Sequence, residues 1–478
     1  MGTFTRVGIT EDMGLSSHAL LRFFEKHAGL GIHSLAIIRD QKAFAISVSP
    51  WREDLPHTLF SLSKSFCSMA AGLAVSEGLL SFEDSVADVL KDSLPEGYDK
   101  KLHEVKLRHL LSMSSGLDEK SDQRSLRQKK DWAREVLGFR VLHEPGTRFR
   151  YHTLGTYLAG RMVAVRAGMS LRDYLMPRLF QPLGINKPQW DCCPIGYNTA
   201  GFGLHLSCLD LARVAQLLLG RGRWGEKQLL PEEFLAQATG KQIDNLDLAA
   251  RDRHPDWESG YGWQFWLARN NRYRGDGMYG QVMMVDEGRN LALAVTAGLN
   301  LMGDELDALH MLMDELLALP QAGKDEQERL KNLRPAVSPP PDAGEALFGE
   351  GSYFTGDSRA LRLETPDGDT LRVFYTGRGA SRPLLYTFGR KDPHRGEYYS
   401  PAAGERPQAY LGRFGVSGGV ITAQALMPGA PYSLRLEIKK EENGALMVAM
   451  KSIGSDEGRF RFEDAKKPGI RGFHPLNP

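Results

Sequence analysis

Blocks of apolar and polar positions divide the first two thirds of the chain into strands at both ends and helices between them. Two apolar runs, residues 35–38 and 43–48, flank a polar tetrapeptide and predict a pair of strands. Apolar residues then recur at helical spacing from Ser61 to about Gly78. Further helical patterns, each closed by glycine, proline or a polar cluster, cover residues 108–112, 154–166, 171–179 and 209–219.

A second strand pair and a long helix end this region. Residues 278–285 and 291–296 flank a polar, glycine-containing segment and predict a hairpin of two buried strands. An apolar helix is expected to follow from about Asp304 to Leu319. Strands and helices in this order predict an α+β layer structure, an α/β sandwich, over residues 1–320.

The composition changes to charge and proline over residues 321–346, which we interpret as a linker. Residues 347–478 carry short strand-like patterns separated by turn signals such as Pro366-Asp367-Gly368, and almost no helical pattern. A small antiparallel β-barrel or sandwich is therefore expected. The clearest strand patterns cover residues 361–365, 371–375, 420–426, 433–438 and 445–450.

Overall charge and composition argue against several classes of function. The 60 lysines and arginines nearly cancel the 59 aspartates and glutamates, so no net field attracts nucleic acid or an anionic membrane. No apolar stretch reaches the roughly 18 residues of a membrane span, and the N-terminus lacks a signal core, so we expect a cytoplasmic protein. The 13 histidines lack metal-ligand spacing. We expect no metal and no other cofactor.

The candidate chemistry begins with Ser61 and Lys64, which stand one helical turn apart where the first helix starts. Residues at i and i+3 share a helix face, whereas Ser63 points elsewhere. Burial and the positive end of the helix dipole both favour the neutral lysine amine. A neutral amine can take the hydroxyl proton and make Ser61 a nucleophile. The alternative is a capping serine followed by a surface lysine.

Two further segments supply groups that acyl transfer needs. Tyr151 precedes a helix start, and a phenolate there, favoured by a cationic lysine, would share the base role with Lys64 and later protonate the leaving group. Residues 275–281 contain three glycines, are expected to open a strand, and allow close approach of backbone to substrate. The N–H of Met278 would join that of Ser61 in an oxyanion hole.

Together these segments resemble the motifs of the β-lactamase-related serine hydrolases, which include class C β-lactamases, penicillin-binding proteins, carboxylesterases and D-aminopeptidases. The resemblance covers roughly residues 35–319. It implies the penicillin-recognising fold, an antiparallel sheet flanked by helices with a helical subdomain, and the roles given above for Ser61, Lys64 and Tyr151. A following barrel also resembles the branch of this family with a lipocalin-like C-terminal domain. The matching segments are Ser61-x-x-Lys64, Leu110–Leu117, Pro145–Tyr151, Asp210–Arg213 and Gly277-x-x-Gly280-Gln281.

Departures from the family pattern bear on the substrate. Thr153 replaces the asparagine of Tyr-x-Asn, and Gly275-Asp276-Gly277 replaces Lys-Thr-Gly or His-x-Gly. These positions are the expected substrate contacts, and Asp276 would repel a substrate carboxylate. Met113 takes the place of a common histidine, a change that we interpret as structural.

We therefore expect an esterase or amidase that acts on a small or peptide-like substrate through an acyl-enzyme on Ser61. A D-amino-acid-specific peptidase or a weak β-lactamase is the alternative. A catalytically silent relative that binds a ligand or peptide is an alternative of another class. Three structural alternatives stay open. Tyr151 would be a packed aromatic residue, and the three glycines would form a simple turn. The aromatic residues 257–266 would belong either to the core or to the wall of a pocket. Oligomeric state, including a homo-oligomer, is also open.

Overall fold

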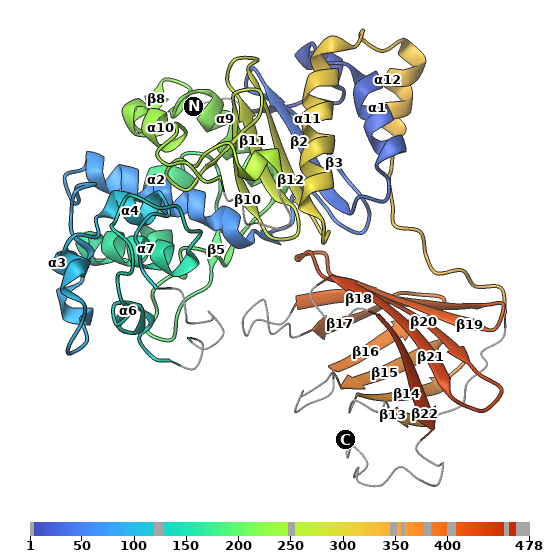
Figure 1. Ribbon diagram of the computed structural model, residues 1–478. Helices are drawn as coiled ribbons and strands as arrows, with labels where there is room; N and C mark the ends of the chain where they lie inside the picture. The colour runs from blue at the N-terminus through green and yellow to red at the C-terminus, as the bar shows by residue number, and fades with distance from the viewer. Residues whose placement is uncertain are drawn as a thin grey trace. The chain divides into compact units, whose positions relative to one another are not determined.

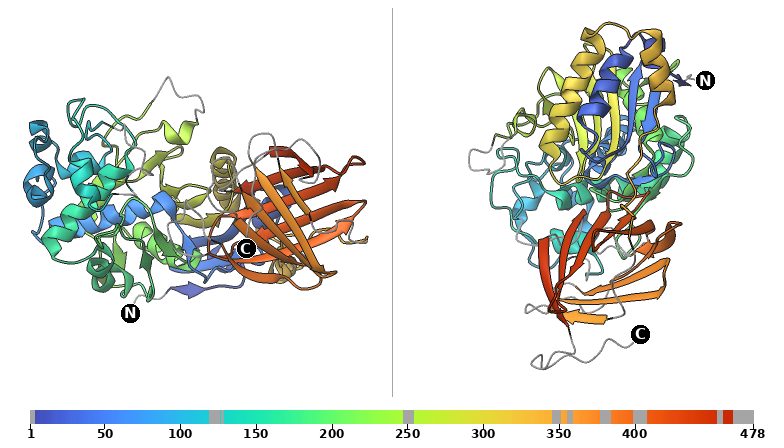
Figure 2. Two further views of the ribbon diagram at one scale, coloured as in Figure 1. Left: turned by 90° about the horizontal axis from the view of Figure 1, so that it is seen from below. Right: turned by 90° about the vertical axis from the view of Figure 1, so that its right-hand side faces the viewer.

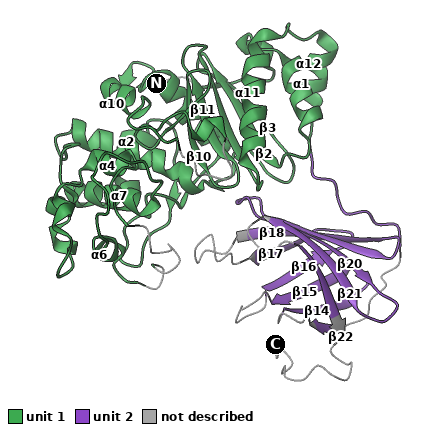
Figure 3. Ribbon diagram, in the orientation of Figure 1, with its two compact units in different colours: residues 1–335 green, residues 336–478 purple. Residues whose placement is uncertain are grey.

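The computed structural model describes residues 4–118, 126, 129–246, 254–344, 351–354, 359–376, 384–398, 408–453 and 458–464. The chain forms two compact units, residues 1–335 and 336–478 (Figure 3). Each unit has its own sheet and its own buried residues.

Within the described residues, unit 1 is built on a seven-stranded sheet (Figure 1). All neighbouring pairs are antiparallel except the parallel pair of β1 and β3 at one edge. The strands, in their order across the sheet, are β1 (Thr5–Arg6), β3 (Lys42–Ser47), β2 (Ile32–Arg39), β12 (Leu291–Ala297), β11 (Gln281–Asp286), β10 (Arg272–Gly277) and β9 (Trp266–Ala268).

Both faces of this sheet are covered, which explains why its central strands are apolar runs rather than alternating patterns. Leu35 and Ile37 of β2 pack toward one face, and Ala36 and Ile38 pack toward the other. The right-hand view of Figure 2 looks onto the helices of the first face. These helices are α1 (Ser17–Lys26), α11 (Met302–Ala318) and α12 (Lys324–Asn332).

Helices on the opposite face carry the larger core. The helix α9 (Cys208–Leu219) packs on β2, β11 and β12, while α2 (Ser63–Ser76) contacts β10. The remaining helices cluster around α2 and form a helical subdomain (Figure 1). They are α3 (Val86–Val89), α4 (Leu107–Leu111), α6 (Trp132–Val136), α7 (Thr153–Ala167), α8 (Leu171–Leu175) and α10 (Glu232–Ala238).

The glycine motif lies elsewhere in the hairpin than the sequence indicated. We expected residues 275–281 to open a strand, but Gly275 and Gly277 end β10, residues 278–280 form a turn, and Gln281 begins β11. β10 was missed because three of its six residues are charged and its other members include two glycines. Buried partners stabilise those charges: Arg272 bonds Asp286 of β11, while Arg274 bonds Asp276 within the same strand and the carbonyl of the more distant Asp256.

Unit 2 is an antiparallel meander whose first and last strands, β13 and β22, pair with each other. One parallel pair, Gly389 with Arg413, joins β16 to β18 and nearly closes the sheet into a barrel. The barrel is as expected, whereas its likeness to lipocalins stays a prediction. Its strands are β13 (Gly351–Phe354), β14 (Ala360–Asp367), β15 (Thr370–Thr376), β16 (Leu384–Gly389), β17 (His394–Tyr398), β18 (Gln408–Ser417), β19 (Val420–Leu426), β20 (Ser433–Lys440), β21 (Leu446–Ile453) and β22 (Gly458–Asp464).

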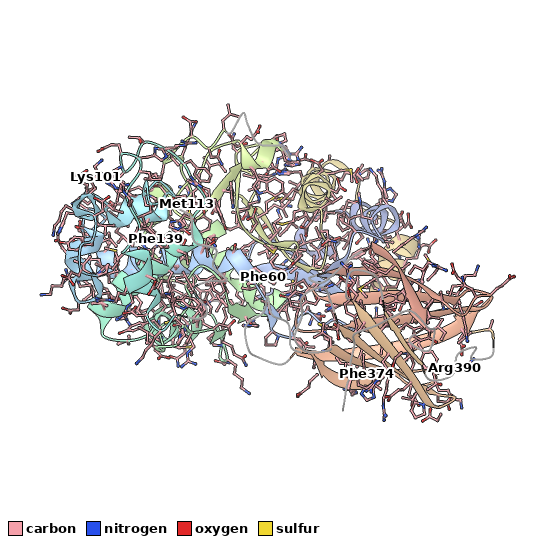
Figure 4. All side chains as sticks on the ribbon, turned by 60° about the horizontal axis from the view of Figure 1, so that its bottom comes forward. Phe60, Lys101, Met113, Phe139, Phe374 and Arg390 are labelled. Carbon is pink, nitrogen blue, oxygen red and sulfur yellow. The ribbon has the colours of Figure 1, made fainter. Side chains whose placement is uncertain are left out.

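Residues 321–346, which we expected to be a linker, include structured segments in both units. The helix α12 begins at Lys324, and its Leu330 is buried against the core under α1. On the barrel side, Asp342 accepts a hydrogen bond from the N–H of Val416 and pairs with Arg390, which Figure 4 labels. A charged amphipathic helix with one buried leucine resembles a linker in composition, which explains the difference.

Across the described part of the chain, none of the helices combines the length and the apolar character that crossing a membrane requires.

Candidate active site

Ser61 lies in a single 3₁₀ turn, Phe60–Leu62, that leads directly into α2. The Nζ atom of Lys64, in the first turn of α2, lies 3.1 Å from Ser61 Oγ and donates a 2.7 Å hydrogen bond to the carbonyl of Gly201. The two side chains therefore meet, as their spacing predicted. Ser63 turns away and bonds the Phe60 carbonyl instead.

The environment of Lys64 favours the uncharged amine. The side chain is buried, and loss of hydration lowers its pKa from 10.5 to about 7. The negative charge of Asp276 acts in the opposite direction and limits the decrease. Near neutral pH a large fraction of Lys64 can therefore accept a proton.

Tyr151 is the third group at this point. It stands two residues before α7 and is hydrogen-bonded to Ser61. Its ring centroid lies 4.9 Å from Lys64 Nζ, and its ring stacks on Trp266 at 5.5 Å. Burial and the charge of Asp276 both raise the pKa of the phenol well above 10. Our expectation of a phenolate was wrong, because burial and the negative charge of Asp276 both disfavour the ionised phenol.

Met113, which stands where relatives have a histidine, holds the segment that carries Tyr151 (Figure 4 labels Met113). Its carbonyl accepts a 2.7 Å hydrogen bond from the N–H of Arg150. Its sulfur accepts from the N–H of His152 at 3.2 Å. Backbone bonds on both sides of Tyr151 thus fix the phenol, which agrees with a structural role for Met113.

Thr153 and Gly201 close the site behind the amine. A methyl group on Gly201 would lie 2.7 Å from Thr153 Cγ2 and 3.5 Å from Lys64 Nζ, so no larger residue fits there. Thr153 is buried and begins α7. Gly201 was not predicted as a site residue, although the run Gly201-Phe202-Gly203 after a left-handed Ala200 marks a tight backbone segment.

The end of β10 packs directly on the nucleophile turn. A methyl group on Gly277 would lie 2.1 Å from the carbonyl oxygen of Leu59 and 3.1 Å from the amide nitrogen of Ser61. On Gly275, it would clash with Ser65 Oγ at 2.6 Å. Gly277 therefore lies against the amide of Ser61, and Met278 follows it in the chain. The N–H of Met278 as an oxyanion-hole donor stays a prediction.

Asp276 is a buried, paired group rather than a solvated turn residue. Its Oδ2 lies 3.0 Å from Arg274 Nη2 and accepts from Trp257 Nε1 at 3.3 Å. Arg274 is fully buried, and the sequence analysis did not consider it. The guanidinium of Arg274 bonds Asp276 and the carbonyl of Asp256. It therefore does not replace the lysine or histidine that the family pattern has at the position of Gly275.

An aromatic cluster extends from Tyr151. Trp266 meets Tyr261 edge to face at 4.8 Å, and Phe149 contacts Tyr261 at 5.2 Å. Met278, by contrast, exposes 55% of its surface. The stack on Tyr151 makes Trp266 part of the site's surroundings, so it is more than an ordinary core residue.

Over the described ranges, no group of three or more histidine, cysteine, aspartate or glutamate side chains is placed to hold a metal ion.

Solved structures with the same fold include a putative 6-aminohexanoate-dimer hydrolase from Bacillus anthracis (17% identity, TM-score 0.53), which aligns over 62% of this chain and 82% of its own. A putative β-lactamase from Bacteroides dorei (18% identity, TM-score 0.53) aligns over 64% of this chain and 99% of its own. A family VIII carboxylesterase (16% identity, TM-score 0.51) aligns over 63% of this chain and 96% of its own.

No curated protein matches the chain in sequence. The β-lactamase family model, however, matches residues 22–317, more than half of the chain. Its limits enclose the sheet strands β2 and β9–β12 as well as every candidate residue given above. The chain therefore belongs to the β-lactamase family of serine hydrolases.

Proposed function

We propose that this protein hydrolyses an ester or amide through an acyl-enzyme on Ser61. The observation that carries the proposal is the 3.1 Å contact between Ser61 Oγ and a buried Lys64 whose pKa is lowered to about 7. A hydroxyl beside an uncharged amine is an activated nucleophile. A silent binding protein gains nothing from burying a lysine at this point, since burial of a charge costs free energy.

The proposed acylation follows from the positions of three groups. Ser61 Oγ attacks the substrate carbonyl carbon while its proton passes to Lys64 Nζ. The N–H groups of Ser61 and Met278 stabilise the oxyanion that forms. As the intermediate collapses, the bond to the leaving group breaks, and Tyr151 gives its phenolic proton to that group. Lys64 then returns a proton to Tyr151.

Deacylation reverses these roles. Water loses a proton to Lys64 as it attacks the acyl carbon. The bond to Ser61 then breaks as Tyr151 gives its proton to the Ser61 oxygen, and Lys64 returns a proton to Tyr151. The raised pKa of Tyr151 suits this scheme, because a phenol that keeps its proton at neutral pH serves as an acid and as a relay.

The substrate that fits best lacks a carboxylate at the position facing Gly275 and Asp276. No lysine or histidine stands at Gly275, and Arg274 is engaged with Asp276. Esters come first, in line with the likeness in fold to a family VIII carboxylesterase. Amides come second, in line with the likeness to an aminohexanoate-dimer hydrolase.

Labelling with a fluorophosphonate followed by mass spectrometry tests the nucleophile. The expected adduct lies on Ser61, is absent in Ser61→Ala and persists in the matched neighbour variant Ser63→Ala. An adduct that survives Ser61→Ala unchanged contradicts the assignment. No ester turnover by the wild type, or turnover that Lys64→Ala leaves intact, favours the silent relative.

A substrate panel separates the remaining alternatives. We expect p-nitrophenyl esters to be hydrolysed faster than D-aminoacyl anilides and nitrocefin. Preference for the anilides indicates the peptidase, and efficient nitrocefin hydrolysis contradicts the effect ascribed to Gly275 and Asp276.

A further inference from the structure

The turn between β10 and β11 carries the candidate oxyanion donor Met278 and has an unusual backbone. Tyr279 and Gly280, which follow Met278, have φ angles of 67° and 87°. Phe60, which precedes Ser61 and is labelled in Figure 4, has a φ of 47°. The rings of Phe60 and Tyr279 meet edge to face at 5.3 Å. Left-handed backbone in bulky residues persists only where the surroundings impose it.

One side chain ties this turn to the centre of the sheet. Gln281 is fully buried, and its Nε2 donates to the carbonyl of Met278 at 3.2 Å and to the carbonyl of Ala297 at 2.8 Å. Its Oε1 accepts from the N–H of Ala297 at 3.3 Å. Both carbonyls face the amide nitrogen and the N–H faces the amide oxygen, so the orientation of the amide is determined by its partners.

The anchor point is itself a special position. Ala297 ends β12 at a register irregularity in its pairing with β2. The regular ladder between β11 and β12 stops at Val282 and Val295, so the main chain beyond it needs other partners. The Gln281 amide provides them, and thereby connects β12 to the peptide group that follows Met278.

We propose, on the basis of the acyl transfer proposed above, that Gln281 is a positioning residue for the oxyanion hole. It holds the Met278 carbonyl and so limits rotation about the bonds of Met278. The N–H of Met278 belongs to the adjoining peptide plane and is thereby kept toward Ser61. Gln281 itself contacts no reacting atom in this scheme.

The test uses Gln281→Met in the full-length protein. Methionine keeps the length of the side chain but loses all three hydrogen bonds. Removal of an oxyanion donor costs about 10²–10³ in rate, and a donor that is only misaligned should cost less, about tenfold to a hundredfold. We expect this loss in kcat for a p-nitrophenyl ester, with KM changed less than threefold.

Inhibition by a boronic acid gives a second measurement, because a purely structural role of Gln281 would not change the inhibition constant. The serine oxygen adds to boron, its proton goes to Lys64, and a boron-bound oxygen occupies the oxyanion position. The inhibition constant should rise in Gln281→Met by the same factor by which kcat falls. The control is Gln216→Met, the same change at a buried glutamine that bonds the N–H of Gln41.

Gln281→Glu extends the test and replaces Gln281→Met if that variant does not fold. A carboxylate would face two carbonyl oxygens, whereas a protonated carboxyl still donates one hydrogen bond. The activity of Gln281→Glu relative to wild type should therefore fall as the pH rises.

Two outcomes overturn the inference while the proposed function stands: wild-type boronate affinity in both Gln281 variants, or an equal loss in Gln216→Met. Wild-type protein that neither hydrolyses esters nor acquires a label on Ser61 refutes the proposed function instead.

Discussion

Replacing Asp276 with asparagine should shift the pH dependence of catalysis toward lower pH. The carboxylate of Asp276 raises the pKa of Lys64 and partly offsets the effect of burial. Asparagine removes that charge with little change in volume. Loss of this charge lowers the pKa of Lys64.

The pKa of Lys64 determines how the activity of the wild-type protein depends on pH. With a pKa of about 7, half of Lys64 is neutral at pH 7. At its ordinary pKa of 10.5, only about 1 in 3,000 would be neutral, so burial increases the usable base roughly 1,500-fold. The value of kcat/KM should rise about tenfold per pH unit below pH 7 and level off above it. A nearby charge moves a pKa by about 1–3. Asp276→Asn should therefore shift the rising part of the pH profile, its acidic limb, to a pH that is lower by roughly one unit.

The assay measures kcat/KM for a p-nitrophenyl ester from pH 5 to 9. Asp286→Asn is the matched control, because Asp286 is equally buried and pairs with Arg272 at the far end of the same strand pair. Its limb should stay at the wild-type position. An unmoved or raised limb in Asp276→Asn, an equal shift in both variants, or a wild-type limb above pH 9 would refute the reasoning.

Four further changes have defined outcomes. Gly277→Ala should reduce kcat at least about a hundredfold, because its methyl group meets the Leu59 carbonyl; unchanged kcat would show that β10 can retreat. Tyr151→Phe should slow anilide hydrolysis more than p-nitrophenyl ester hydrolysis, since p-nitrophenolate leaves without a proton; equal losses would argue against an acid role. Ser63→Ala should lower unfolding free energy by about 1–2 kcal/mol in denaturant titrations while labelling persists, because its hydroxyl donates to the Phe60 carbonyl and accepts from the N–H of Leu204. Burial raises the pKa of Glu305 to about 8, so the folded protein loses stability as the pH rises from 4.5 to 8. The melting temperature of Glu305→Gln should therefore increase relative to that of the wild type over this range. A difference in melting temperature that does not change with pH would contradict the raised pKa.

Local spacing accounts for what could be predicted about the nucleophile. Ser61 and Lys64 are three residues apart, so helix geometry alone brings them together. The buried strands β2, β11 and β12 were likewise visible as apolar runs, because such runs arise when both faces of a sheet are covered.

The rest depends on partners distant in sequence. β10 is unusual in carrying alternating charges, and the burial of its arginines depends on Asp286 for Arg272 and on the carbonyl of Asp256 for Arg274. The protonation of Tyr151 depends on how completely its neighbours exclude water, which no motif records. The support that Gln281 gives to Met278 requires the carbonyl and N–H of Ala297, on another strand.

The two faces of β10 restrict how selectivity in this protein can be redesigned. Gly275 and Gly277 leave no room for a side chain toward the turn that carries Ser61 and the start of α2, and each charged residue on the opposite face already has a partner. A mutant library directed at this strand would consist largely of inactive or unfolded clones. Diversity is better introduced at Trp266, whose ring stacks on the phenol, and at Phe149, whose ring contacts Trp266; neither ring takes part in the proposed proton transfers.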